Sequence, residues 1–474
     1  MMRKRNGQRG VAIGLAVTAV TLASCPLAAA QRTANFSAAA TATTPAPADG
    51  FSGWEKKITD VNHAGEPEIA VGPDGGPLVV AFNGCGIAVS EDRGASFAVS
   101  PKHPADPGPT PGDPYHYCSD PAAAIGPGNV LYTGAGWWDT PGGDVDYYNM
   151  YVARSADGGV SWSKPVFATG DRDAPQQLLL GRNTGHTDRL FLTADAGTGT
   201  VYASATDFPR FVRWVVASHD RGATFGPPQA IDSPLYPQIQ GEQAGDYIPA
   251  AANGLVAFAY AASAAPGDAS CPCGIFETSR NDGATWTRHP TPFPANWVAA
   301  DRSHPGRFAI MSGQGVTATP AFSGAIAVST TDDSGRTWSK PVLIGQSTTH
   351  PEIQPWIAYS PTGVLGVGYK TLYSGLISQP QFFLDILSGN LSYTYDFWTA
   401  VSFDNGRRFS QSLRVSNAVS PPGNAAGNDD FSNVALDEGY LYAAWGDQRT
   451  SPTNPAPGPV AVYFARVPLQ AYSK

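Results

Sequence analysis

The sequence predicts an all-β fold, a β-propeller of four-stranded sheets closed by an N-terminal strand. Three observations support this prediction. One eight-residue motif occurs six times, and its final aromatic residue stands at positions 97, 162, 225, 286, 338 and 409. Short apolar or alternating segments precede each copy, as expected of strands. The composition, with 52 Gly, 42 Pro and only 15% charged residues, is rich in turns. A repeat of about 60 residues indicates one unit copied around a solenoid or propeller.

The repeated motif reads Ser/Thr-x-Asp-x-Gly-x-x-Trp/Phe and is typical of a tight turn between two strands. In the copy that starts at Ser155, the Asp157 carboxylate can accept hydrogen bonds from nearby backbone N–H groups, and Gly159 can adopt positive φ without a Cβ clash. Trp162 then begins the next strand and can fill the space against a neighbouring sheet. The six copies are Ser90–Phe97, Ser155–Trp162, Ser218–Phe225, Ser279–Trp286, which has Asn281 in the Asp place, Thr331–Trp338 and Ser402–Phe409. We expect each copy to join the third and outermost strands of one sheet.

The inner strands predict the number of sheets, called blades. Each repeat opens with a polar or acidic cluster that leads into two apolar strands, as in Glu66–Val71 followed by Pro77–Phe82. Counting weaker openings near Asp171 and Asn296 gives seven. From 55 to 467 is 413 residues, or about 59 per blade for seven blades. The last repeat ends in Val460–Val467, a third strand, so we expect the orphan strand Trp54–Thr59 to complete that blade. Six blades is the alternative.

The N-terminus predicts export. Basic residues from Arg3 to Arg9 precede the apolar run Val11–Leu22, and Ala28–Ala30 provides a cleavage site, so residues 1–30 are expected to be a signal peptide. The apolar run is too short to span a membrane. Residues 31–50, rich in Ala, Thr and Pro, are expected to be a disordered tether, and residues 51–474 one propeller domain. Leu22–Cys25 also resembles a lipobox that would lipidate Cys25. The expected location is therefore secreted or cell-surface.

The net charge and the cysteine content indicate which binding partners and disulfides to expect. A net charge of −9 argues against a nucleic-acid partner, and we expect a monomer with a solvated acidic surface. We expect no cofactor, and no residue pattern indicates a structural calcium or a metal site. Export permits disulfides. Cys85 follows a second strand and Cys118 precedes the next first strand, which places both at one face of the ring and predicts a bridge. Cys271 and Cys273 form a separate tight pair.

The six motifs resemble the Asp-box, or bacterial neuraminidase repeat, of the sialidase superfamily, over residues 55–467. The resemblance implies that the boxes lie on the face away from the active site. The aspartates of the five full copies are therefore expected to be structural: Asp92, Asp157, Asp220, Asp333 and Asp404. The site would lie on the opposite face, around the ring axis. The family's Phe/Tyr-Arg-Ile-Pro segment is replaced by Glu66–Ile69, so its first arginine is missing.

The same resemblance implies catalytic candidates. Sialidases use a Tyr nucleophile with a Glu partner, an Asp acid/base and arginines for the substrate carboxylate. Leu441–Arg449 resembles the strand that ends in the family's acid loop, with Asp447 as the acid. Asp139 is its counterpart in the second repeat. A local ion pair between Asp447 and Arg449 is the alternative. Glu242 with Tyr247, and separately Tyr373, are the candidate nucleophile groups.

Basic and aromatic residues on the same predicted face are candidates for substrate binding. Arg172, Lys370 and Arg449 can donate charge-assisted hydrogen bonds to an anionic sugar. Trp138 and Trp445 are candidate stacking platforms, with ordinary packing between blades as the alternative.

These observations favour a sialidase-like glycoside hydrolase that acts on an extracellular glycan. The alternative is a propeller that binds glycan or protein without catalysis. A lyase for uronic-acid polymers is a third hypothesis, which would need a Tyr/His pair that no spacing here identifies.

Overall fold

The computed structural model describes residues 53–59, 65–72, 75–100, 102–108, 117–139, 147–168, 187–207, 212–231, 248–261, 274–312, 325–345, 352–373, 394–420, 432–447, 449 and 460–473. Side chains at the strand ends 117, 119, 138, 139, 147–149, 187–189, 207, 212, 261 and 353 are outside this description. The predicted signal peptide, the tether and Cys25 lie outside the described residues, as do Cys271 and Cys273. No helix of the described part is long and apolar enough to cross a membrane.

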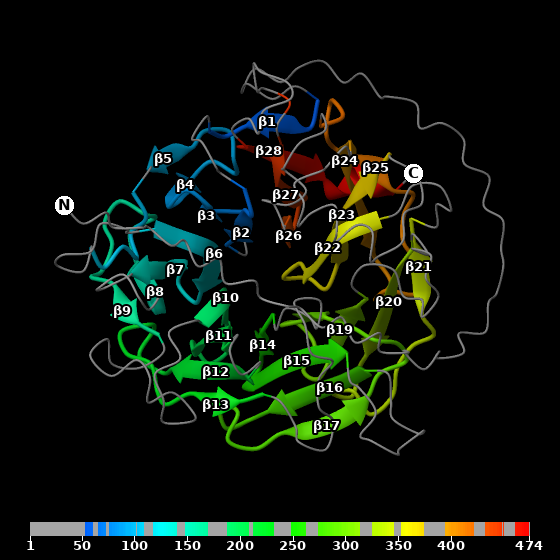
Figure 1. Ribbon diagram of the computed structural model, residues 1–474. Coiled ribbons are helices and arrows are strands. Elements are labelled where there is room, and N and C mark those ends of the chain that lie inside the picture. Colours follow the sequence, from blue (N-terminus) through cyan, green and yellow to red (C-terminus); the bar gives the residue numbers. More distant parts are fainter. Residues whose placement is uncertain are drawn as a thin grey trace, which may run out of the picture.

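Seven antiparallel four-stranded sheets surround a common axis, which confirms the predicted fold and blade number (Figure 1). The first strand of each blade is innermost. The blades, in chain order, are β2 (Glu68–Val71), β3 (Leu78–Phe82), β4 (Gly86–Ser90), β5 (Ala98–Ser100); β6 (Tyr117–Gly126), β7 (Val130–Asp139), β8 (Tyr147–Ser155), β9 (Val166–Phe167); β10 (Thr187–Ala194), β11 (Val201–Asp207), β12 (Val212–Ser218), β13 (Gln229–Ala230); β14 (Ala250–Ala252), β15 (Leu255–Ala261), β16 (Gly274–Ser279), β17 (Thr287–Pro290); β18 (Trp297–Ala300), β19 (Phe308–Met311), β20 (Ile326–Thr331), β21 (Val342–Ile344); β22 (Glu352–Tyr359), β23 (Leu365–Leu372), β24 (Tyr395–Ser402), β25 (Leu413–Arg414); and β26 (Asn433–Leu436), β27 (Tyr440–Asp447), β28 (Ala461–Pro468), β1 (Glu55–Lys57).

The ring closes as predicted. Strand β1 pairs antiparallel with β28, with Glu55 opposite Ala465 and Lys57 opposite Tyr463, and so supplies the outer strand of the seventh blade. A short 3-10 helix, η3 (Leu469–Tyr472), follows β28. One prediction was displaced: the third blade opens at β10 (Thr187–Ala194), 16 residues after Asp171 (187 − 171). Extra length in a connection between blades costs little, because the entropy of closing a loop grows slowly with its length.

Each Asp-box is a turn built by one hydroxyl and one carboxylate. In the third blade, Ser218 Oγ accepts the N–H of Gly222 at 2.8 Å and donates to Asp220 Oδ1 at 2.8 Å. The same Asp220 oxygen accepts the N–H of Thr224 at 2.8 Å. The residue before the box glycine also has positive φ, for example 58° at Arg221, so two successive residues turn the chain. Asn281 makes the same bonds in the fourth blade through its amide oxygen, which explains why that copy tolerates the exchange.

The boxes also join neighbouring blades. Trp338 packs on Phe276 of the preceding blade, with ring centroids 5.2 Å apart at 86°, and its Nε1 donates to Pro290 O at 3.1 Å. In the other direction, Arg154 Nη1 donates to Arg221 O in the next box at 2.8 Å. Each box therefore terminates one hairpin and fastens it to the blades on both sides.

Replacement of a box hydroxyl should destabilise the ring. In Ser218→Ala, the buried N–H of Gly222 and the Asp220 carboxylate lose their partner, so we expect a loss of about 1–3 kcal/mol in the free energy of unfolding. Urea unfolding would measure it. Ser100→Ala, at a half-buried residue whose hydroxyl makes only exposed hydrogen bonds to Lys102, serves as the control, with an expected change of about 0.5 kcal/mol or less. Equal effects of the two changes would contradict this account of the box.

A disulfide and a buried histidine hold the segment between the first two blades. Cys85 and Cys118 are bridged, with their Cα atoms 5.7 Å apart. Nearby, His103 is buried: its Nδ1 accepts the N–H of Ala105 at 3.1 Å, and its Nε2 lies 3.0 Å from Thr133 Oγ1. Burial lowers the pKa of His103 to about 3, so the ring stays neutral in the folded protein.

This histidine should make the fold sensitive to acid. Between about pH 6.5 and 3 the unfolded chain binds a proton at position 103 that the folded protein does not, so stability falls as pH falls, by about 1.4 kcal/mol per unit. We expect His103→Gln to reduce this pH dependence in urea unfolding measured from pH 7 to 4.5. His289→Gln, at a partly buried ring on the outer strand β17, is the control and should leave the slope unchanged. An unaltered slope in His103→Gln would refute the assignment.

Candidate functional site

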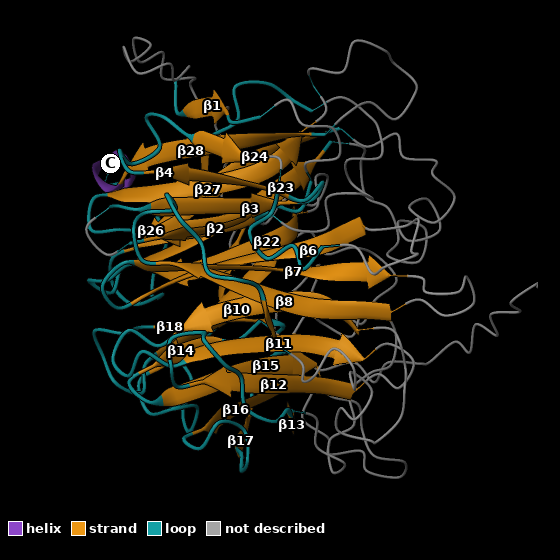
Figure 2. Ribbon diagram, turned by 90° about the vertical axis from the view of Figure 1, so that its left-hand side faces the viewer, coloured by secondary structure: helices purple, strands orange, loops and turns teal. Residues whose placement is uncertain are grey.

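The two ends of the ring differ in character. One end, here called the box face, carries the six boxes and the turns between first and second strands. The other end, here called the site face, is where second strands end and third strands begin. Figure 2 shows the strands running between the two ends. The strand register places Glu352, Leu372 and Tyr395 of the sixth blade, and Asp447 of the seventh, at the site face.

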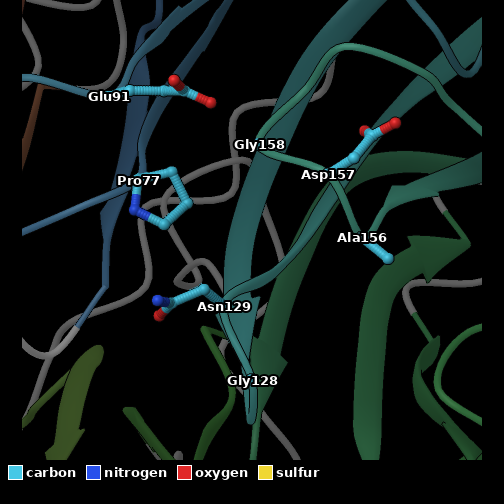
Figure 3. Close-up of a pocket in the computed structure, with 7 residues that line it drawn as sticks. All are labelled: Pro77, Glu91, Gly128, Asn129, Ala156, Asp157 and Gly158. Carbon is cyan, nitrogen blue, oxygen red and sulfur yellow. The ribbon is translucent and has the colours of Figure 1, made fainter.

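The described pocket lies on the box face. A cavity of about 320 Å³ opens between the first two blades and is lined by Pro77, Glu91, Gly128, Asn129, Ala156, Asp157 and Gly158 (Figure 3). Asp157 is already bonded to Ser161 and Ser155, and hydrogen bonds from Ser161 and then Ser155 lower its pKa to about 2. Its carboxylate is therefore committed to the turn, as expected for a structural Asp-box residue, and the pocket brings no nucleophile or acid together.

A tyrosine and a buried carboxyl form the most reactive arrangement at the site face. Tyr373, directly after β23, donates its hydroxyl hydrogen to Asp396 Oδ2 at 2.8 Å and has 38% of its side chain exposed. The same oxygen lies 2.6 Å from Arg414 Nε, and Trp398 Nε1 donates to the other oxygen at 2.5 Å. Burial raises the pKa of Asp396, while the bonds from Tyr373 and Arg414 oppose this rise. Burial, followed by the neighbouring Asp396, raises the pKa of Tyr373.

A second carboxyl shares this side of the sixth blade. Glu352 on β22 pairs in register with Thr371 on β23, which pairs with Asp396 on β24. The three side chains therefore lie on one face of the sheet, with about 10 Å between the outer two strands. Thr371 Oγ1 donates to Glu352 Oε2 at 2.5 Å. Burial raises the pKa of Glu352 to about 8, so it carries a proton at neutral pH.

The predicted acid Asp447 is tied into an ion-pair network. Arg449 Nη2 lies 2.5 Å from Asp447 Oδ2, and Arg449 Nη1 donates to both oxygens of Glu55 at 2.8 and 2.9 Å. The guanidinium also stacks on Tyr463, 4.4 Å from the ring centroid. Glu55 Oε2 further accepts the N–H of Asn417 in the sixth blade at 2.9 Å. The closing strand β1 is thus fastened to the site-face end of two blades.

Two predicted binding residues are buried instead. Trp445 stacks on Phe397, with ring centroids 5.1 Å apart and planes 4° apart, so it offers no face to a sugar and the stacking prediction was wrong for it. Trp445 instead packs between blades, which was the alternative interpretation. Lys370 is buried with its Nζ 4.7 Å from the centroid of the Tyr395 ring. Both residues alternate along strands whose two faces are covered by neighbouring blades, which is why they lie inside.

The other candidates stay predictions. Arg172, Glu242 and Tyr247 lie outside the described residues. Trp138 and Asp139 end strand β7 at the site face, but their side chains are outside the description. Of the residues predicted from the sequence, the structure therefore brings Tyr373, Asp447 and Arg449 to the site face.

Sequence reasoning missed Asp396, Glu352 and Glu55. Asp396 lies in Tyr395-Asp396-Phe397, where the alternation of a strand hides a buried carboxyl among aromatic residues. Its signal was an acid at an inward position of a strand two residues from Trp398. Glu55 carried no signal, because its partner Arg449 is 394 residues away.

Comparison with known proteins extends the fold assignment only. No family model matches the chain, and no curated protein matches it. Among solved structures, it is similar to "Hadza microbial sialidase Hz136", with 16% identity over 84% of this chain and 75% of that chain and a TM-score of 0.43. The intramolecular trans-sialidase from Ruminococcus gnavus is 12% identical over 76% of this chain and 96% of that chain, with a TM-score of 0.42. The structure "YCF48 bound to D1 peptide" is 12% identical over 90% of this chain and 99% of that chain, with a TM-score of 0.42.

Loss of the Glu55 carboxylate should weaken ring closure. In Glu55→Gln, the buried Arg449 guanidinium and the N–H of Asn417 lose their charged acceptor at unchanged side-chain volume, so we expect a loss of about 1–3 kcal/mol in urea unfolding. Glu91→Gln, at an exposed carboxylate on the box face, is the control and should stay within about 0.5 kcal/mol of the parent. If Glu55→Gln unfolds like the parent, the network does not fasten β1.

Proposed function

We propose that this protein is a sialidase-like glycoside hydrolase of extracellular glycans, with Tyr373 as its nucleophile. The observation that carries the proposal is the Tyr373–Asp396 hydrogen bond of 2.8 Å at the site face. It joins a half-exposed phenol to a carboxyl that the Arg414 guanidinium contacts at 2.6 Å. A nucleophile within hydrogen-bond reach of a base, which a third group orients, is the general signature of covalent catalysis.

The chemistry follows from these contacts. Tyr373 Oη attacks the anomeric carbon while its proton passes to Asp396, and the bond to the leaving-group oxygen breaks. Glu352, protonated at neutral pH, supplies the proton of the leaving alcohol. Water then attacks the glycosyl-tyrosine and gives a proton to Glu352, and Asp396 returns its proton to Tyr373. We assign the acid to Glu352 rather than Asp447, because Arg449 already occupies Asp447 Oδ2 at 2.5 Å.

A propeller that binds glycans without catalysis is the second candidate. It is favoured by the Arg449 network, in which the guanidinium that was expected to hold a substrate is shared between Asp447 and Glu55.

Removal of the Tyr373 hydroxyl tests the proposal. Purified residues 51–474 would be assayed on a fluorogenic panel of sialosides, neutral glycosides and uronic glycosides. We expect Tyr373→Phe to lower kcat/KM by about 10²-fold or more on the substrate that the parent cleaves, because the nucleophile is lost. Tyr440→Phe is the matched control: this ring lies at the box-face end of β27, between Arg93 and Arg466, and its loss of a hydroxyl should leave activity unchanged.

Two outcomes would overturn the proposal. No release from any member of the panel would favour the binding propeller. Cleavage that survives in Tyr373→Phe would remove Tyr373 as the nucleophile.

A further inference from the structure

Four buried side chains near the ring axis have polar atoms without a hydrogen-bond partner. They are Trp297 Nε1, Gln354 Oε1, Ser432 Oγ and Asn433 Oδ1, here called the axial polar set. The exposed fractions of the four residues are 7%, 5%, 1% and 3%. All four stand in or just before the site-face start of the innermost strands of three successive blades, β18, β22 and β26. Buried polar atoms are nearly always paired, so a cluster of exceptions requires an explanation.

Gln354 also has a backbone irregularity. Its φ is 47°, in the left-handed region that a residue with a Cβ rarely adopts, and it precedes Pro355. The same irregularity occurs at Glu66 and Asp120, which likewise precede a proline at the opening of an innermost strand, but of the three only Gln354 has an unpaired polar atom. The pairing of β22 with β23 shifts register between Ile353 and Trp356, so Gln354 occupies a bulge. A β-bulge redirects a side chain out of the regular alternation and is common beside functional sites. Strain and an unpaired amide at the same residue are expected where a ligand completes the structure.

Aromatic rings lie directly beside the axial polar set. Trp356, two residues after Gln354, meets Phe191 of the third blade with ring centroids 6.2 Å apart. The third and sixth blades are not neighbours, so these rings meet across the axis. Trp297 belongs to the same apolar cluster. These rings are buried, as Trp445 is, so we assign them a packing role at the axis and assign recognition of a sugar to the polar atoms, which can pair with its hydroxyl groups.

The described cations near this face are already engaged. Arg414 pairs with Asp396 at 2.6 Å, Arg288 with Glu277 at 2.7 Å, and Arg449 with two carboxylates. Lys370 and Arg213 are buried. The axial polar set itself contains two amide oxygens, a hydroxyl and an indole N–H, and no charge. This set matches hydroxyl groups, which both donate and accept, better than it matches a carboxylate.

We propose that the axial polar set binds one uncharged sugar unit through its hydroxyl groups, and that the glycan recognised by this protein is neutral rather than anionic. The identification of this sugar as a substrate rests on the proposed function, whereas its binding does not. A phenol nucleophile accommodates an anionic sugar but does not require one, so Tyr373 is compatible with this choice.

The test separates binding from catalysis. Tyr373→Phe protein would be screened on an array of neutral and sialylated glycans, and the Kd of the best ligand would be measured by calorimetry. In the Tyr373→Phe background, we expect Gln354→Leu to raise that Kd by about tenfold, the effect of one hydrogen bond to a buried acceptor. Gln229→Leu, at a half-buried amide on the outer strand β13, is the matched control and should leave the Kd unchanged. Without ligand, Gln354→Leu should unfold at the same urea concentration as its parent or a higher one, because it removes an unpaired polar atom.

Each result bears on one proposal. Neutral-glycan binding that is lost in Gln354→Leu, together with no hydrolysis by the parent, would support the axial site and refute the hydrolase. Preferential binding of sialylated glycans, or a Kd unaffected by Gln354→Leu, would overturn the axial site whatever the activity. A Gln354→Leu protein that is less stable without ligand would show that the amide has a structural partner, and would also overturn it.

Discussion

The structure depends on the fastening of each blade to the next by the same turn. A propeller has no core shared by all its blades, so each sheet must bury both faces against its two neighbours. The box meets this need at one point, since its hydroxyl and carboxylate fix the turn while its aromatic ring packs on the preceding blade. Trp338 does so on Phe276, and Phe97 does so on Phe464 across the closure of the ring, with centroids 5.1 Å apart. The seventh blade, which lacks a box, is fastened instead by the pairing of β1 with β28.

The fold could be predicted because its determinants are local. The conformation of an eight-residue turn is determined by its own residues, and the six copies of the turn indicate that the fold is a repeat. A second device was missed: Asp195 in the turn after β10 accepts N–H groups from Gly197 at 2.7 Å and from Gly254 of the next blade at 2.6 Å. Asp437 in the turn after β26 accepts the N–H groups of Gly439 and Tyr440 in its own turn, both at 2.7 Å. These aspartates follow no fixed spacing to an aromatic residue, so the sequence alone does not distinguish them from surface carboxylates.

The candidate site was less predictable for a physical reason. Its partners come together through register across strands and between blades, which no short motif records. Tyr373 was found through its local resemblance, but Asp396 is 23 residues away and Glu352 is 21 residues before it (373 − 352). Asp447 and Arg449 were expected to face a substrate. The strand β1, which the sequence placed correctly, brings Glu55 against that arginine and changes its role.

Ring closure and the site face are therefore coupled through one guanidinium. Arg449 receives Glu55 from the first strand, Asp447 from its own blade and the Tyr463 ring from β28, while Glu55 also reaches Asn417 of the sixth blade. That sixth blade carries Tyr373, Asp396 and Glu352. Breaking a buried ion pair leaves an uncompensated charge, so loosening of β1 would be transmitted to the strands that hold the proposed nucleophile. A ring that closes with its own N-terminal strand in this way makes the geometry of its candidate site depend on complete folding of the chain.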